Sequence, residues 1–167
     1  MSAPGRAPLE VLRQRLDPAQ AALIPAHVTL CREDELSALD VDALVTRIHT
    51  WPHGTLTLAF GAPQRFQGHG VLLPGVQGDD AFQRLRQWLL ADPAARVHHA
   101  HLTLAHPRNP RAPGNTDAAL AGVPTALRLG FAQVALVQQA GAEPWQVLWQ
   151  APLGGLGHVL PGPGLLG

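Results

Sequence analysis

Apolar residues recur along the chain with two different periods, one typical of helices and the other of strands. A spacing of three and four residues predicts three amphipathic helices, whose apolar faces carry Leu9, Leu12 and Leu16; Val41, Leu44, Val45 and Ile48; and Phe82, Leu85, Trp88 and Leu89. The third of these helices is expected to carry Arg84 and Arg86 on its polar side. Residues 1–8 lack such a pattern and are expected to form a flexible start.

Capping sequences indicate where the helices begin. The expected starts are Pro8, Pro18 after the N-cap Asp17, Val41 after the N-cap Asp40, and the first residues of a helix capped by Gly78-Asp79-Asp80, with a further short helix over 116–120. Each helix is followed by a glycine, a proline or both, which predicts short helices separated by turns.

Alternation of apolar and polar residues predicts the strands, which are 26–31, 55–60, 66–73, 99–104, 126–139 and 145–153. A hairpin through Gly61-Ala62-Pro63 is expected to join the second strand to the third, and residues 140–144 to join the last two. In the first strand, His27, Thr29 and Cys31 share one face.

The series of a strand with His-x-Thr, a helix and a hairpin occurs twice, which indicates an internal duplication. We therefore predict a single domain over 1–167, with a first lobe and connecting helix at about 25–92 and a second lobe at about 96–153. Residues 154–167 are rich in glycine, proline and leucine without a period, and are expected to be a tail.

Composition excludes several classes of protein. The 12 basic residues, all arginine, balance 12 acidic residues, so there is no general positive charge for gripping a long nucleic acid. Cys31 is the only cysteine, which rules out an intramolecular disulfide and a cysteine zinc cluster. The sequence has neither the apolar core of a signal peptide nor a membrane-length apolar run, so we expect a cytoplasmic protein without a membrane partner.

The candidate chemistry lies in two matching motifs, His27-Val28-Thr29-Leu30 and His101-Leu102-Thr103-Leu104, which begin corresponding strands. If the two halves pack about a pseudo-twofold axis, two imidazoles and two hydroxyls meet across one cleft. One imidazole can then remove a proton from an attacking oxygen while the other protonates the leaving oxygen of a phosphodiester. The hydroxyls suit the phosphate between them. This division of labour needs no metal or other cofactor.

With these paired motifs, from about Pro25 to Leu153, the sequence resembles the 2H phosphoesterase superfamily, and most of all its bacterial RNA 2',3'-cyclic phosphodiesterases and 2'-5' RNA ligases. The resemblance implies an α+β, bilobal fold in which two antiparallel sheets line a central groove with helices outside. It also implies metal-free hydrolysis of a 2',3'-cyclic phosphate to a 2'-phosphate. By the same resemblance, His27 would donate the proton to the leaving 3'-oxygen, His101 would act as the base, and Thr29 and Thr103 would bind the phosphate.

Other side chains offer alternatives. His98, His99 and His106 crowd the second motif, and His99 is expected to share a strand face with His101, yet a third acidic ligand and an HExxH motif are missing. Cys31 beside His27 would allow a thiol nucleophile, but the matching residue Ala105 favours a small residue that fills the floor of the groove.

Arginines and aromatic residues near the motifs are further candidates. Arg32 and Arg108 each follow a motif strand and can bind substrate phosphate at the mouth of the groove, although solvated surface arginines would look the same. Trp51, Phe60 and Phe66 can stack on a base, but aromatic residues at the ends of elements more often belong to the core.

Together these observations predict an enzyme that hydrolyses a 2',3'-cyclic phosphate on an RNA end or a small nucleotide, with 2'-5' RNA ligation as a related activity. Its substrate is expected to be short, and the protein to be a monomer. The alternatives are a non-catalytic protein of the same fold that binds nucleotides or RNA ends, and a structural interaction domain in which the duplicated histidines are incidental.

Overall fold

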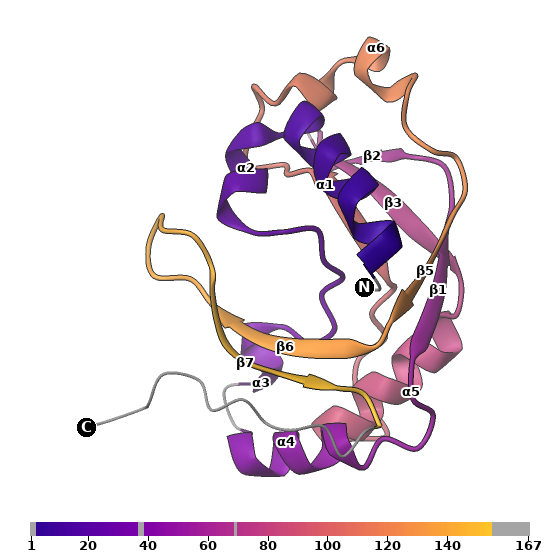
Figure 1. The fold of residues 1–167 in the computed structure, drawn as a ribbon, viewed down its shortest axis with the longest axis vertical. Coiled ribbons are helices and arrows are strands. Elements are labelled where there is room, and N and C mark those ends of the chain that lie inside the picture. The colour runs from indigo at the N-terminus through magenta and orange to yellow at the C-terminus, as the bar shows by residue number, and fades with distance from the viewer. Residues whose placement is uncertain (1–2, 37–38, 69, 155–167) are drawn as a thin grey trace.

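The computed structural model of the chain describes residues 3–36, 39–68 and 70–154, which form a mixed α/β structure with two antiparallel sheets (Figure 1). The helices are α1 (Ala3–Leu16), α2 (Pro18–Leu23), α3 (Glu33–Leu36), α4 (Val41–His49), α5 (Asp79–Leu90) and α6 (Asp117–Leu120), with a 3-10 helix η1 (Pro113–Asn115). The strands are β1 (Leu56–Phe60), β2 (Gln64–Phe66), β3 (Gly70–Gln77), β4 (His101–Ala105), β5 (Leu127–Phe131), β6 (Gln133–Gln138) and β7 (Gln146–Pro152). The fold therefore agrees with the prediction of an α+β protein with two antiparallel sheets.

The larger sheet has five strands in the order β2-β3-β1-β5, with β4 also paired to β3, and the smaller sheet consists of β6 and β7. In Figure 1, α1, α2 and α6 lie toward one end of the molecule and α4 and α5 toward the other. The core contains the inward side chains of β1, β3 and β4 and most of the predicted helix faces, namely Leu9, Leu12 and Leu16 of α1, Leu44 and Ile48 of α4, and Phe82, Leu85 and Leu89 of α5. The prediction is wrong for Val41 and Trp88, which are exposed. Among the described residues, no helix is long and apolar enough to cross a membrane.

The starts of α2 and α4 follow the predicted capping sequences. The Asp17 carboxylate accepts a hydrogen bond from the Gln20 backbone N–H, and Asp40 accepts one from Asp42. The expectation of a flexible start is wrong for residues 3–8, because α1 already begins at Ala3 and includes Pro8. The tail predicted for 154–167 lies, except for Gly154, outside the described residues.

Two strand predictions are wrong in their boundaries. The strand expected at 66–73 is split by a turn at Gln67 and Gly68, both with positive φ, into β2 and β3. These two strands form the hairpin, whereas β1 pairs with β3 and β5. The strand expected at 126–139 changes sheets at Ala132, so that β5 pairs with β1 and β6 with β7.

The segment over 26–31, predicted as a strand, is not a strand and has no sheet partner among the described residues. It passes through the middle of the molecule between α2 and α3 (Figure 1). Side-chain hydrogen bonds hold this segment in place, rather than pairing with a neighbouring strand. The Arg13 guanidinium donates to the Ile24 carbonyl, the Glu10 carboxylate accepts the Ala26 N–H at 2.8 Å, and the Arg86 guanidinium donates to the Leu30 carbonyl.

Arg86 does not lie on the polar side of α5, as the sequence suggested, but is 0% exposed. Its guanidinium also binds both carboxylate oxygens of Glu35, at 2.6 and 3.3 Å, and the Arg96 carbonyl at 3.1 Å. These bonds satisfy much of the hydrogen-bonding capacity of a cation that would otherwise be costly to bury. Arg86 thus joins α5 to α3 and to the end of the first motif.

Candidate active site

A pocket of about 350 Å³ opens where α1, α2, the 26–31 segment and β4 meet. It is lined by Arg13, Gln20, Ile24, His27, Thr29, Arg32, Phe66, Gln67, His101, Thr103, Leu104, His106 and Arg108. The fold therefore brings together, around one cavity, both motif histidines, both threonines and the two arginines singled out in the sequence.

The two motifs reach this pocket by different routes. In β4, His101 and Thr103 face the pocket while Leu102 and Leu104 are buried, and Leu72 and Pro74 of β3 fix the register of the strand. The first motif has the same alternation without a sheet. Its His27 and Thr29 line the pocket, whereas Val28 and Leu30 pack against the core.

Both imidazoles are oriented in the same way. The Nδ1 atom of His27 lies 2.8 Å from the Pro25 carbonyl, and the Nδ1 atom of His101 lies 3.1 Å from the His99 carbonyl. Because a carbonyl oxygen can only accept, each Nδ1 carries the hydrogen, and the Nε2 atom is the one that exchanges a proton. Each ring can therefore act as a base when neutral and as an acid when protonated.

The pocket concentrates positive charge on a chain that is neutral overall. Arg13, Arg32 and Arg108 line it, and none of the described lining residues is acidic. Arg32 is exposed and lies 3.4 Å from Asp34, whereas Arg13 is 4% exposed. Such a pocket favours an anionic ligand, and exposed arginines at its rim can bind phosphate oxygens.

Several groups around His27 affect the pKa of its imidazole. Burial lowers its pKa, the hydrogen bond to Pro25 and the charge of Glu10 oppose this, and Arg13 and His101 lower it further. The side chain of His27 is nevertheless exposed toward the pocket, so solvent moderates the effect of burial on its pKa. The pKa of His27 therefore lies below its ordinary value, which favours the neutral imidazole.

The remaining histidines of the second motif do not form one cluster. His98 packs against Phe82 and His101, with ring centroids 6.2 and 5.5 Å apart, while His99 is exposed and lies 2.8 Å from Asp79. The expected shared strand face of His99 and His101 is wrong, because β4 begins only at His101. His106 lines the pocket, and the described residues contain no group of three His, Cys, Asp or Glu side chains placed to hold a metal ion.

Cys31 does not fit a nucleophilic role. Burial raises the pKa of its thiol to about 11, so the reactive thiolate is scarce at neutral pH. Neither Cys31 nor Ala105 belongs to the pocket lining, and the expectation that they fill its floor is also wrong.

The aromatic candidates separate into two groups. Trp51 and Phe60 are buried in the core, but Phe66 lines the pocket next to Gln67 at the β2–β3 turn. A ring at this position offers a surface on which a base can stack.

The sequence analysis missed Arg13 and His106 as pocket residues. The position of Arg13 does indicate burial, because it lies four residues after Leu9 and one after Leu12, on the otherwise apolar face of α1. His106 follows β4 directly, and its position depends on its backbone N–H bonding the buried Asp17 carboxylate at 2.9 Å, which no local pattern indicates.

Comparison of the chain with models of protein families found no match, and a search of the curated proteins found no match either. The functional assignment therefore depends on the geometry of the pocket and on the paired motifs.

Proposed function

We propose that the protein is a metal-independent phosphodiesterase that opens a 2',3'-cyclic phosphate on an RNA end or a small nucleotide to leave a 2'-phosphate. The observation that carries this proposal is the convergence of His27, Thr29, His101 and Thr103 on one positively charged pocket, with both imidazoles held through Nδ1. The same proposal gives the chain the bilobal 2H phosphoesterase fold, with lobes near 25–92 and 96–153.

In the proposed reaction, a water oxygen attacks phosphorus opposite the 3'-oxygen. The neutral imidazole takes the proton of the water through Nε2, the bond from phosphorus to the 3'-oxygen breaks, and the imidazolium gives its Nε2 proton to that oxygen. The phosphate stays on the 2'-oxygen, and the two rings exchange protons with solvent to restore their starting states. The threonine hydroxyls donate to the non-bridging oxygens, where negative charge accumulates.

The lowered pKa of His27 bears on which ring is the base. A lowered pKa favours the neutral form that accepts the proton of the water, so we assign the base to His27, which leaves the role of the acid to the second histidine of the pair, His101. This is the reverse of the order that the resemblance implies. If a 5'-hydroxyl replaces water, the same two proton transfers make a 2'-5' linkage, which accounts for ligation as a related activity.

The size and charge of the pocket favour a short substrate. A cavity of about 350 Å³ is at the lower end of the range for small-molecule sites, and the zero net charge of the chain gives no wide surface for a long RNA. A second candidate function, binding of a nucleotide or RNA end without catalysis, uses the same pocket and differs only in the absence of turnover.

The deciding experiment is incubation of the four nucleoside 2',3'-cyclic monophosphates with the protein in excess EDTA, with products separated as 2'- and 3'-phosphates. We expect 2'-phosphates at an undiminished rate under chelation, because histidines supply both proton transfers. Binding without turnover would support the second candidate. Loss of activity in EDTA that zinc restores would contradict the metal-independent mechanism.

The threonines provide a second test. Thr29→Val and Thr103→Val keep the side-chain shape but remove the hydroxyl, and each is expected to lower kcat/KM by about 10- to 10³-fold, the cost of one transition-state donor. Thr46→Val is a matched control, because Thr46 is an exposed residue of α4 whose hydroxyl donates only to the Asp42 carbonyl. Normal rates in both pocket variants would exclude the threonines from phosphate binding.

A further inference from the structure

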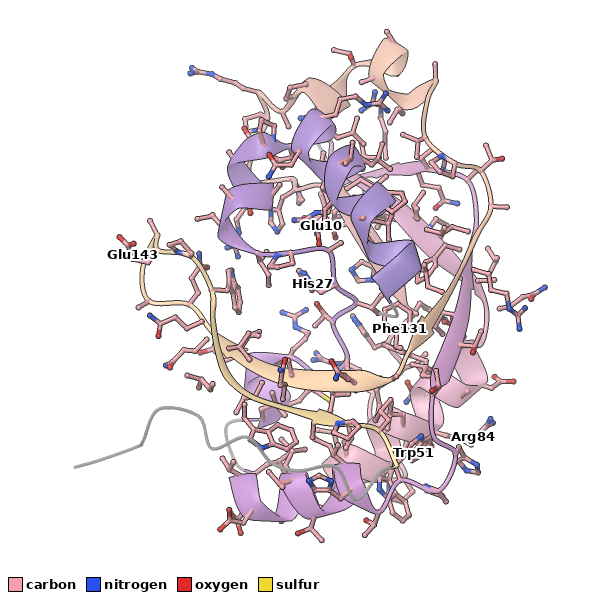
Figure 2. All side chains as sticks on the ribbon, in the orientation of Figure 1. Glu10, His27, Trp51, Arg84, Phe131 and Glu143 are labelled. Atoms are coloured by element: carbon pink, nitrogen blue, oxygen red, sulfur yellow. The ribbon has the colours of Figure 1, made fainter. Side chains whose placement is uncertain are left out.

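The hydrogen bond that orients each of the two motif histidines ends on a peptide group whose N–H donates to a carboxylate. The peptide joining Pro25 to Ala26 accepts from His27 Nδ1 through its oxygen, at 2.8 Å, and donates through its N–H to Glu10 Oε1, also at 2.8 Å. Glu10 and His27 lie close together on neighbouring segments in Figure 2. Carboxylate, peptide and imidazole thus form one continuous chain of hydrogen bonds.

The second motif repeats this arrangement with different elements. The peptide joining His99 to Ala100 accepts from His101 Nδ1 at 3.1 Å and donates to Asp79 Oδ1 at 3.2 Å. Glu10 belongs to α1 and Asp79 to α5, so neither carboxylate is expected from the spacing of the motifs. Because the two peptides stand in the same place relative to their histidines, the carboxylates are equivalent partners of the two motifs.

We propose that Glu10 and Asp79 are positioning residues that control the basicity and the tautomer of His27 and His101 through the intervening peptides. This inference rests on the proposed function, which it deepens. A carboxylate that accepts from a peptide N–H polarises the peptide and makes its oxygen a stronger acceptor. The stronger acceptor fixes hydrogen on Nδ1 and stabilises the imidazolium that forms during proton transfer, as a direct carboxylate partner does in serine hydrolases.

Other charged and titratable groups face these hydrogen-bond chains and also act on the two histidines. His27 is met by Arg13 and His101 and, across the pocket, by Arg32, His106 and Arg108. Glu10 lies 3.9 Å from the Arg13 guanidinium. On the other side, His101 packs against the ring of His98, and Asp79 pairs with His99. Glu10 also raises the pKa of His27 directly through its charge, so the hydrogen-bond chain is measured by the tautomer share and by the difference between Glu10→Gln and Glu10→Ala, which remove the same charge.

The hydrogen bonds of the two chains differ in length, and this difference predicts which carboxylate has the larger effect. Both bonds of the Glu10 chain are 2.8 Å, whereas those of the Asp79 chain are 3.2 and 3.1 Å. Because shorter charge-assisted bonds are stronger, Glu10 is expected to influence its histidine more than Asp79 does.

The experiment is a titration of the imidazole nitrogens by NMR in the substrate-free protein, together with kcat and KM for the cyclic nucleotide. Glu10→Gln and Asp79→Asn keep an amide oxygen for the peptide N–H but remove the charge. We expect each to move the titration of its own histidine to lower pH, to increase the share of the Nε2–H tautomer, and to lower kcat about 10-fold with little change in KM. Glu10→Ala, which removes the acceptor as well, should have the larger effect.

Matched controls are Asp80→Asn, which removes an exposed carboxylate next to Asp79, and His99→Ala, which removes the imidazole next to Asp79 Oδ2 but keeps the carbonyl and Asp79. Both are expected to leave the titration of His101 unchanged. If Glu10→Gln and Asp79→Asn alter only the melting temperature, the carboxylates are structural and the proposal fails. Because the titration needs no turnover, it can succeed even when the phosphodiesterase assignment is wrong, so the two failures are distinguishable.

Discussion

His27→Ala and His101→Ala are each expected to lower kcat/KM for a 2',3'-cyclic nucleotide by about 10² or more, the contribution of one proton-transfer group. The double variant is expected to lose less than the product of the two single losses. Both rings serve one transition state, so once either is missing the other has little left to contribute. Steady-state rates of the four proteins, fitted as a double-mutant cycle, measure this coupling.

The pH profile gives an independent check on the same pair. A neutral and a protonated imidazole must coexist, so kcat/KM is expected to follow a bell whose limbs belong to the interacting pair. Burial, Arg13 and His101 lower the pKa of His27, which places the limb of a basic His27 on the acidic side of the ordinary value. In His27→Ala, that limb should disappear from the residual activity.

A control histidine separates a specific effect from a general one. His53 is exposed in the turn after α4 and packs edge-on against Trp51, away from the pocket lining. His53→Ala should retain full activity. If the pocket variants also stay active and change only in stability, the binding or structural alternatives replace the enzyme. If one histidine proves essential and the other does not, the two-histidine mechanism is wrong.

Arg86→Met is expected to lower the free energy of unfolding by about 3–5 kcal/mol, because the Leu30 and Arg96 carbonyls lose their donor and Glu35 keeps only the exposed Arg96 as an ion partner. For a chain of this size the melting temperature should fall by about 6–20 °C. The control is Arg84→Met on the same helix, where the arginine is exposed and projects outward (Figure 2). Equal melting temperatures in the two variants would contradict a stabilising role for the buried pair.

The double variant Arg86→Met, Glu35→Gln separates stability from positioning. Removing both charges should recover much of the lost stability, since neither ion is then left alone. Activity should be low in both Arg86 variants, because each loses the hydrogen bond from Arg86 to the Leu30 carbonyl at the end of the first motif. Full recovery of activity with stability would show that this bond does not position His27 and Thr29.

Acid should weaken the same interaction. Arg86 holds the pKa of Glu35 at about 2, well below its ordinary value of 4.5, through hydrogen bonds and charge, although burial opposes this. The contribution to stability is therefore complete above about pH 4.5 and is lost as the pH falls toward 2. Thermal unfolding followed from pH 6 to pH 2 should show a steeper decline for the wild type than for the double variant.

Local patterns predicted α2, α4, α5, α6 and most of β4, because capping, helical spacing and alternation act over a few residues. Helix α3 was not predicted. Asp17-Pro18, Asp40 and the alternation of His101 to Leu104 are examples, and the motifs also identified His27, Thr29 and Thr103 as pocket residues. The duplicated order itself, and the division into lobes, remain predictions.

The predictions failed where side chains distant in sequence decide the structure. Alternation made 26–31 look like a strand, but the segment is held by Glu10, Arg13 and Arg86 rather than by a ladder. The change of sheets at Ala132 lacks a glycine or proline at the break, so two strands read as one.

The positions of Arg13, which the sequence analysis missed, and of Arg86, which it placed on the polar side of α5, both indicate burial. Arg13 and Arg86 both occupy positions of an apolar helix face, four residues after Leu9 and Phe82. An arginine within an apolar stripe indicates a buried cation that binds backbone carbonyls.

The two motifs that line the pocket should also differ in how easily each moves away from it. His101 and Thr103 belong to a strand of the larger sheet, so moving their backbone away from the pocket requires breaking the hydrogen bonds between β3 and β4. His27 and Thr29 are attached through a few side-chain anchors, which can release without disturbing either sheet. Sub-global fluctuations of the native state should therefore detach the first motif while the second stays protected from hydrogen exchange. Such a motion would give substrate a way into the pocket at a cost well below that of global unfolding.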